Sequence, residues 1–185
     1  LIYFIHHIST SIQAAHILAS ASEETIETIE RLFPEEIVAE EEESDFEANE
    51  TGKAWHSVAA KSTGYLQSVD VKRMVKLAAA RGTVIRIEKE VGQFITAGSP
   101  LMSSLATSPP DAKDRKKLES LIAVGRQRTI EQDVGFGIRQ IVDIALKALS
   151  PGVNDTTTAV MCVDYLGAIL ARLASRPIAT VRRLD

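Results

Sequence analysis

Two long apolar helices joined by a short polar turn constrain the fold of this chain most strongly. Between residues 126 and 173, apolar side chains recur at close to the 3.6-residue spacing of an amphipathic helix, on both sides of the segment SPGVND at 150–155. Pro151 and Gly152 end the first helix, and Asp155 has the short acceptor side chain that caps the second. We predict that this helix pair forms the main core.

The first of these helices has two candidate starts. Thr129 and Gln132 have the spacing of a capping box, and Asp133 is placed to cap a second start just before Gly135. Both starts lead into the same apolar pattern, so the sequence predicts the helix and leaves its first residue open.

A charged stripe runs along the same helix. Arg139, Asp143 and Lys147 are four residues apart and therefore share one face. One interpretation is that this stripe faces solvent, as charged side chains usually do. The other is that it faces a partner subunit, because apolar residues also occur at Ile144 and Leu146, beyond a single face.

The spacing of apolar residues over 1–33 predicts one long helix that ends before Pro34. The chain begins without Met in an apolar run, and Tyr3 and Phe4 are aromatic residues of the kind that membrane interfaces favour. No apolar run reaches the roughly 20 residues of a complete membrane span. We expect this helix to continue from an upstream membrane segment.

Short strands replace long helices between residues 54 and 124. Alternating patterns and glycine turns predict strands, and Asp70 is placed to cap a helix; the expected elements are strands at 55–59, 64–69, 84–87, 94–95, 101–102 and 122–124, and helices at 71–81 and 111–121. The glycine-punctuated hairpins resemble those of the biotinyl/lipoyl-type small barrel, but the Met-Lys-Met-like turn of that family's modified lysine is absent. The resemblance implies a small barrel or sandwich without a carrier role.

The chain as a whole is predicted to be α+β, with a long N-terminal helix, a small β barrel or sandwich-like lobe and a C-terminal pair of long apolar helices. Its expected parts are a helix continuing from a membrane segment (1–34), an acidic linker (35–53), a β-rich lobe (54–124) and a helical core (125–185). Nine of the sixteen residues from 35 to 50 are acidic and none is basic. Such blocks are typical of solvated linkers.

Composition limits the classes of function. The formal net charge of −4 argues against a general nucleic-acid binder, which presents a basic face. Cys162 is the only cysteine, so no intrachain disulfide can form and nothing indicates an oxidising compartment. His6 and His7 are the candidate metal ligands, but neighbours on a helix point about 100° apart, and local polar contacts are the alternative. We expect no cofactor.

Polar residues around the helix pair are the candidates for chemistry; they are Asp133, Arg139, Asp143, Asn154 and Asp155. Two of these carboxylates near Arg139 would provide an acid–base site. The alternative is that they cap helices and fix the turn. Because no nucleophile elbow, phosphate loop, HExxH or dinucleotide motif is present, we assign no catalytic residue and favour the structural role.

Two groups of motifs resemble a bacterial family of predicted membrane proteins of unknown function. They are RT at 128–129, EQD at 131–133 and FGIRQ at 136–140, followed by SPGVND at 150–155. The opening FIHHI at 4–8 is similar to that family's junction between its last membrane helix and its soluble half. Thr156 stands where family members often have proline. The resemblance implies an integral membrane parent and no established reaction or ligand.

We therefore expect a soluble, cytoplasmic assembly or regulatory domain of an integral inner-membrane protein, and a channel- or transporter-like complex is one setting for it. The predicted helices hold more apolar surface than one small sheet can cover, so a homo-oligomer is expected. Two alternatives come from other classes. One is a membrane-tethered enzyme that uses the carboxylate–arginine set, and the other is a metabolite-sensing module whose small barrel binds a ligand.

Overall fold

The computed structural model describes residues 2–35 and 52–177, with side chains from Gln13 onward. The described residues form two compact units. Residues 2–35 and 129–177 form the helical unit, and residues 52–128 form the β unit. The predicted α+β class is confirmed. The segment predicted as an acidic linker lies almost wholly outside the described residues.

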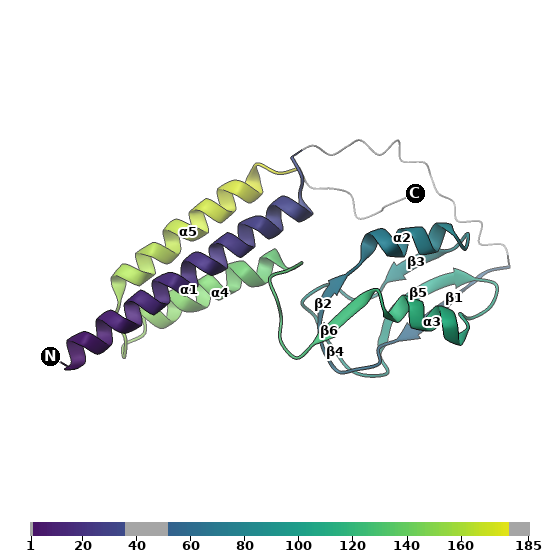
Figure 1. The fold of residues 1–185 in the computed structure, drawn as a ribbon, viewed down its shortest axis with the longest axis horizontal. Helices are drawn as coiled ribbons and strands as arrows, with labels where there is room; N and C mark the ends of the chain where they lie inside the picture. Colours follow the sequence, from purple (N-terminus) through teal and green to yellow (C-terminus); the bar gives the residue numbers. More distant parts are fainter. Residues whose placement is uncertain (1, 36–51, 178–185) are drawn as a thin grey trace. The chain divides into compact units, whose positions relative to one another are not determined.

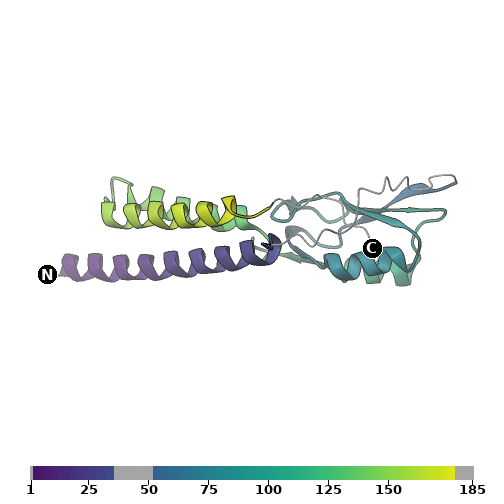
Figure 2. The same cartoon turned by 90° about the horizontal axis from the view of Figure 1, so that it is seen from above.

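Three helices make up the helical unit: α1 (Ile2–Leu32), α4 (Val134–Ala148) and α5 (Thr156–Ala174). They lie side by side (Figure 1 and Figure 2). Each contributes to one apolar core, in which Leu18, Ile29, Ile141, Cys162 and Ile169 are fully buried. The predicted helix pair therefore buries its apolar faces together with the long N-terminal helix.

A close contact between α1 and α4 depends on a glycine. A Cβ atom added at Gly137 would lie 2.0 Å from Oγ1 of Thr25 and 3.0 Å from its Cβ. Thr25 is itself fully buried, and its hydroxyl donates a hydrogen bond to the carbonyl oxygen of Ala21 at 2.5 Å. Gly137 therefore lets the two helices approach at this level.

Ion pairs join the C-terminal ends of α1 and α5. The side chain of Arg176, only 5% exposed, lies 3.2 Å from Glu35 and 3.7 Å from Glu30. Arg172 pairs with Glu30 at 2.6 Å. A buried cation requires such partners, since an unpaired charge in the interior is strongly destabilising.

Two three-stranded antiparallel sheets form the β unit. One has the order β1 (Ala54–Ala59), β5 (Pro100–Ala106), β3 (Val84–Ile87), and the other has the order β4 (Phe94–Ile95), β2 (Gly64–Val69), β6 (Ile122–Gly125). Helices α2 (Val71–Ala79) and α3 (Ala112–Glu119) complete the unit. The strands do not close into a barrel, so the sandwich-like alternative is the one that the structure adopts.

The two sheets share a core. Val58 and Met102 come from one sheet and Ile95 from the other, and all three pack in one cluster with Leu118 of α3. The predicted cap of α2 is confirmed, because Oδ1 of Asp70 accepts a hydrogen bond from the backbone N–H of Arg73 at 3.0 Å.

The second of the two predicted starts of α4 is the correct one. Oδ1 of Asp133 accepts a hydrogen bond from the backbone N–H of Phe136 at 2.9 Å, and the helix begins at Val134. The capping-box start was wrong, because Thr129 and Gln132 precede the helix. Asp133 directly precedes the first helical residue and satisfies one of the free N–H groups of the first turn.

Candidate functional site

The polar residues singled out in the sequence are distributed over the helical unit. Asp133 caps the start of α4, whereas Asp155 caps the start of α5 after α4 has ended. The 15 residues of α4 therefore separate these two carboxylates by roughly 20 Å at the rise of an α-helix. They cannot act together on one substrate bond.

Arg139 and Asp143 form a surface ion pair. Nε of Arg139 lies 3.0 Å from Oδ1 of Asp143, and the two side chains are 64% and 56% exposed. An exposed pair at this spacing contributes only a few tenths of a kcal/mol to stability. Lys147 is exposed as well, so the charged stripe of α4 faces solvent in the single chain.

Asp155 and Asn154 have different roles in the turn between α4 and α5. Oδ1 of Asp155 accepts from the backbone N–H of Thr158 at 3.1 Å, and Oδ2 accepts from the Thr158 hydroxyl at 2.7 Å. Asn154 has a φ of +48°, a left-handed conformation that asparagine tolerates better than most residues. Both side chains were expected to accept cap bonds; in the described turn Asp155 provides the cap and Asn154 the change of chain direction.

His6 and His7 lie on the first turns of α1, where the side chains are outside the described part of the structure. The metal hypothesis for them therefore stays a prediction. Among the residues that are described, no group of three or more histidine, cysteine or acidic side chains is arranged to hold a metal ion.

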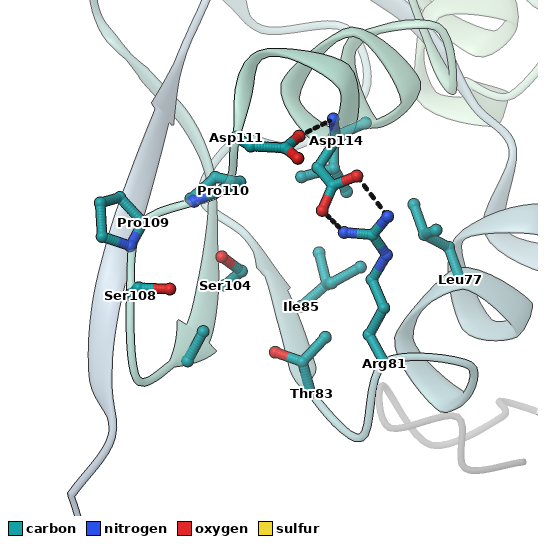
Figure 3. Close-up of a pocket in the computed structure, with 12 residues that line it drawn as sticks. Leu77, Arg81, Thr83, Ile85, Ser104, Ser108, Pro109, Pro110, Asp111 and Asp114 are labelled. Atoms are coloured by element: carbon teal, nitrogen blue, oxygen red, sulfur yellow. Dashed lines mark hydrogen bonds and ion pairs between the residues drawn. The ribbon is translucent and has the colours of Figure 1, made fainter.

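The β unit has a cavity of about 270 Å³ between its two helices and the sheet edge (Figure 3). Arg81 points into this cavity and forms a two-point ion pair with Asp114, whose backbone N–H is capped by Asp111 at 2.7 Å. The arginine charge is thus already neutralised. The cavity is slightly smaller than the roughly 300–1,000 Å³ of typical ligand pockets and offers no uncompensated charge from this pair.

One carboxylate of the β unit has a shifted pKa. The Ser103 hydroxyl donates to Oε1 of Glu88 at 2.6 Å, and Nε of Arg86 donates to the same oxygen at 2.8 Å. These two hydrogen bonds lower the pKa of Glu88. A carboxylate held in its ionised form is unsuited to act as a general acid at neutral pH.

The most unusual surface of the helical unit is an apolar row along α5. Val160, Val163, Gly167, Leu170 and Ala174 recur at alternating spacings of three and four residues, and all five are exposed. We call this row the α5 stripe. Its large members are 60%, 66% and 53% exposed at Val160, Val163 and Leu170, and a Cβ atom at Gly167 would meet no neighbour within 4 Å.

Sequence reasoning placed these residues on an apolar helix but did not separate the buried face from the exposed one. The spacing of apolar residues could have revealed the exposed face, because α5 carries two apolar rows where one is enough for packing. One contains Cys162 and Ile169 and faces the core, and the other is the α5 stripe. A helix that packs only against the other two helices of this unit needs one apolar face, which the first row provides.

By length and composition, α5 is also the one described helix that could cross a membrane. Its mean hydropathy is 1.4 over an 18-residue window, of which 22% is buried in the helical unit. Its 19 residues are close to the roughly 20 needed for a span, so the expectation that no segment reaches this length was wrong for α5. The same properties suit a helix that packs on one side and meets a partner on the other.

Comparison with known proteins decides the family. The model of a family described as "Predicted membrane protein (DUF2254)" matches residues 1–185, the whole chain. The chain belongs to this family. The resemblance inferred from the motifs of α4 and the following turn is therefore confirmed, and the description of the DUF2254 family names no reaction.

Two uncharacterised mycobacterial proteins are similar to this DUF2254 chain. One is from Mycobacterium bovis and the other from Mycobacterium tuberculosis, and each is 35% identical over 189 residues. The alignment covers 100% of the chain and 36% of each relative, so the chain spans about a third of the length of the curated relatives that it matches. No solved structure matches it.

Proposed function

We propose that this chain is the cytoplasmic assembly domain of an integral membrane protein, in which copies associate through the α5 stripe. The proposal is supported first by membership of a family of predicted membrane proteins. The observation that carries it is the exposure of the α5 stripe, a continuous apolar row with the spacing by which helices pair.

The proposed occupant of the α5 stripe is the α5 stripe of a second copy. A three–four repeat of apolar residues is self-complementary, as a two-fold interface requires. Gly167 lies at its centre with open space around it, so a second helix can approach closely there. A parallel pair is the arrangement compatible with a shared membrane, because α1 packs alongside α5 and both copies of α1 would then start at the same end of the dimer.

The attachment to the membrane is proposed to run through α1. This helix has 31 residues, and the apolar run at its start contains Tyr3 and Phe4, aromatic residues of the kind that membrane interfaces favour. Both features fit a continuation of a membrane helix. The cytoplasmic side is supported by the single buried cysteine, since extracytoplasmic domains of this size commonly use disulfides.

Breaking the α5 stripe with a charge is expected to convert the oligomer to a monomer. In size-exclusion chromatography with light scattering at tens of micromolar, the unmodified chain should elute as a dimer or larger assembly. Val163→Glu places an unpaired carboxylate in the apolar contact. We therefore expect the dissociation constant of the assembly to rise by roughly a hundredfold or more.

The matched control is Ile17→Glu on α1. Ile17 is 58% exposed and Val163 is 66% exposed, so both changes put a glutamate at a similarly open apolar position. Ile17→Glu should leave the assembly intact. A monomeric unmodified chain at tens of micromolar, or equal loss of assembly in both variants, would contradict the proposal.

A further inference from the structure

The turn between α4 and α5 carries a second exposed apolar surface, separate from the α5 stripe. Leu146, Leu149 and Val153 are 60%, 55% and 41% exposed, and they lie within one turn of helix and the loop that follows it. We call these three residues the hairpin tip. Single exposed leucines are common on protein surfaces, whereas a group of large apolar side chains at one loop is a candidate contact site.

The hairpin tip lies at the same end of the helical unit as the start of α1 (Figure 1 and Figure 2). The contact of Gly137 with Thr25 sets the level of α4 against α1, which runs in the opposite direction. Counted from that contact, the end of α4 is level with about residue 14 of α1. The first residues of α1 thus project roughly 18 Å beyond α4 at 1.5 Å per residue.

If the start of α1 enters the membrane, these positions along the axis of α1 place the hairpin tip near the membrane surface. The headgroup region on each side of the hydrocarbon core is roughly 5–8 Å thick. Leu149 is level with about residue 13 of α1, roughly 12 Å behind Ile5, where the apolar run at the start of the chain ends. The loop that joins α4 to α5 continues from there toward the start of α1, so the tip comes up against that layer (Figure 1). The geometry points to a further site: we infer that the hairpin tip inserts its apolar side chains into the interfacial layer of the lipid bilayer.

The charges around the hairpin tip suit an anionic lipid surface. Lys147 is exposed between the two leucines, where its ammonium group would meet lipid phosphates. The nearest carboxylates are already engaged, Asp143 by Arg139 and Asp155 by the cap of α5. An apolar tip with an adjacent cation is the composition of interfacial membrane anchors. This inference rests on the proposed membrane attachment of α1 and is independent of pairing through the α5 stripe.

Depth-dependent quenching of a tryptophan tests the inference. Trp55 in the β unit is the single natural tryptophan and gives the background signal. Val153→Trp reports on the hairpin tip, and Ala171→Trp, at an exposed position of the far end of α5 that lies outside the α5 stripe, is the control. The 185-residue chain is mixed with vesicles of three parts phosphatidylcholine and one part phosphatidylglycerol, with or without brominated acyl chains.

Bromolipid is expected to quench the added Val153→Trp emission by about half or more, and to leave Ala171→Trp near the background. Leu149→Asp in the Val153→Trp chain should reduce vesicle binding roughly tenfold. No vesicle binding, an unquenched Val153→Trp, or equal quenching at both positions would overturn the inference. Circular dichroism confirms that each variant is folded.

The outcome separates this inference from the proposed function. If the α5 stripe does not pair but the hairpin tip meets lipid, the unmodified chain is monomeric and Val153→Trp is still quenched. If copies pair but the tip stays in water, the chain is oligomeric and neither tryptophan is quenched. Equal quenching at both positions assigns the whole exposed face of α5 to lipid.

Discussion

Replacing Gly137 with alanine is expected to destabilise the helical unit by about 1–2 kcal/mol. Overpacking a filled contact costs about 1–3 kcal/mol, and the added Cβ atom would lie 2.0 Å from Oγ1 of Thr25. Thr25 cannot turn away freely, because it is fully buried and hydrogen-bonded to Ala21. The gain of about 1 kcal/mol from alanine in a helix offsets only part of this loss.

The two units each contain a natural probe for this measurement. Cys162 is the only cysteine and is buried in the helical core, so its labelling by a thiol reagent in increasing urea reports the opening of that unit alone. The fluorescence of Trp55 follows the β unit in the same sample. We expect Gly137→Ala to move the thiol transition to lower urea and to leave the tryptophan transition in place.

Two further variants identify the cause. Gly167→Ala adds the same methyl group where no atom of the same chain lies within 4 Å, so at concentrations at which the chain is monomeric it should raise stability by up to about 1 kcal/mol. Thr25→Ala combined with Gly137→Ala removes Oγ1 and Cγ2 of Thr25 and leaves only its Cβ atom, 3.0 Å from the added methyl group, so the pair should show a favourable coupling of about 1 kcal/mol. Equal effects of alanine at both glycines would refute the close-contact explanation.

Asp155→Ala is expected to cost about 1–3 kcal/mol in the same assay. Loss of a cap alone costs about 0.5–2 kcal/mol. The substitution also removes the acceptor of the Thr158 hydroxyl, which donates to Oδ2 of Asp155 in a residue that is only 3% exposed. A buried hydroxyl that loses its acceptor is destabilising by about 1–3 kcal/mol unless it finds another partner.

Conservative changes in the turn provide the controls. Asp155→Asn keeps one acceptor for the backbone of Thr158 and should recover most of the loss. Asn154→Gly should be close to neutral, since glycine adopts the φ of +48° without strain, whereas Asn154→Ala should cost about 1 kcal/mol. A stability unchanged by Asp155→Ala would show that this carboxylate is kept for some purpose other than the cap.

Local patterns predicted the secondary structure well because each boundary has a local cause. Asp70, Asp133 and Asp155 cap their helices through hydrogen bonds that span three residues, and such interactions are visible in sequence. The strands of the β unit are bounded by glycines with positive φ, among them Gly92 and Gly98. None of these features depends on distant parts of the chain.

The arrangement in space was less accessible from the sequence. Nothing local indicates that Thr25 meets Gly137, or that Arg176 is buried against Glu30 and Glu35. The apolar residues of α5 looked alike in sequence, and only the positions of α1 and α4 decide which of them are covered. The candidate carboxylates likewise shared one stretch of sequence, yet the length of α4 keeps Asp133 and Asp155 apart.

The helical unit is discontinuous in sequence, and this has a consequence for synthesis on the ribosome. About one hundred residues separate the end of α1 from the start of α4, and they include the whole β unit. At roughly 5–20 residues per second, α1 emerges some 5–20 s before the helices that cover its buried face. During that interval the β unit is free to complete its own fold, while the buried face of α1 lacks the two helices that cover it. The core of the helical unit therefore closes last, when the α4–α5 hairpin has emerged.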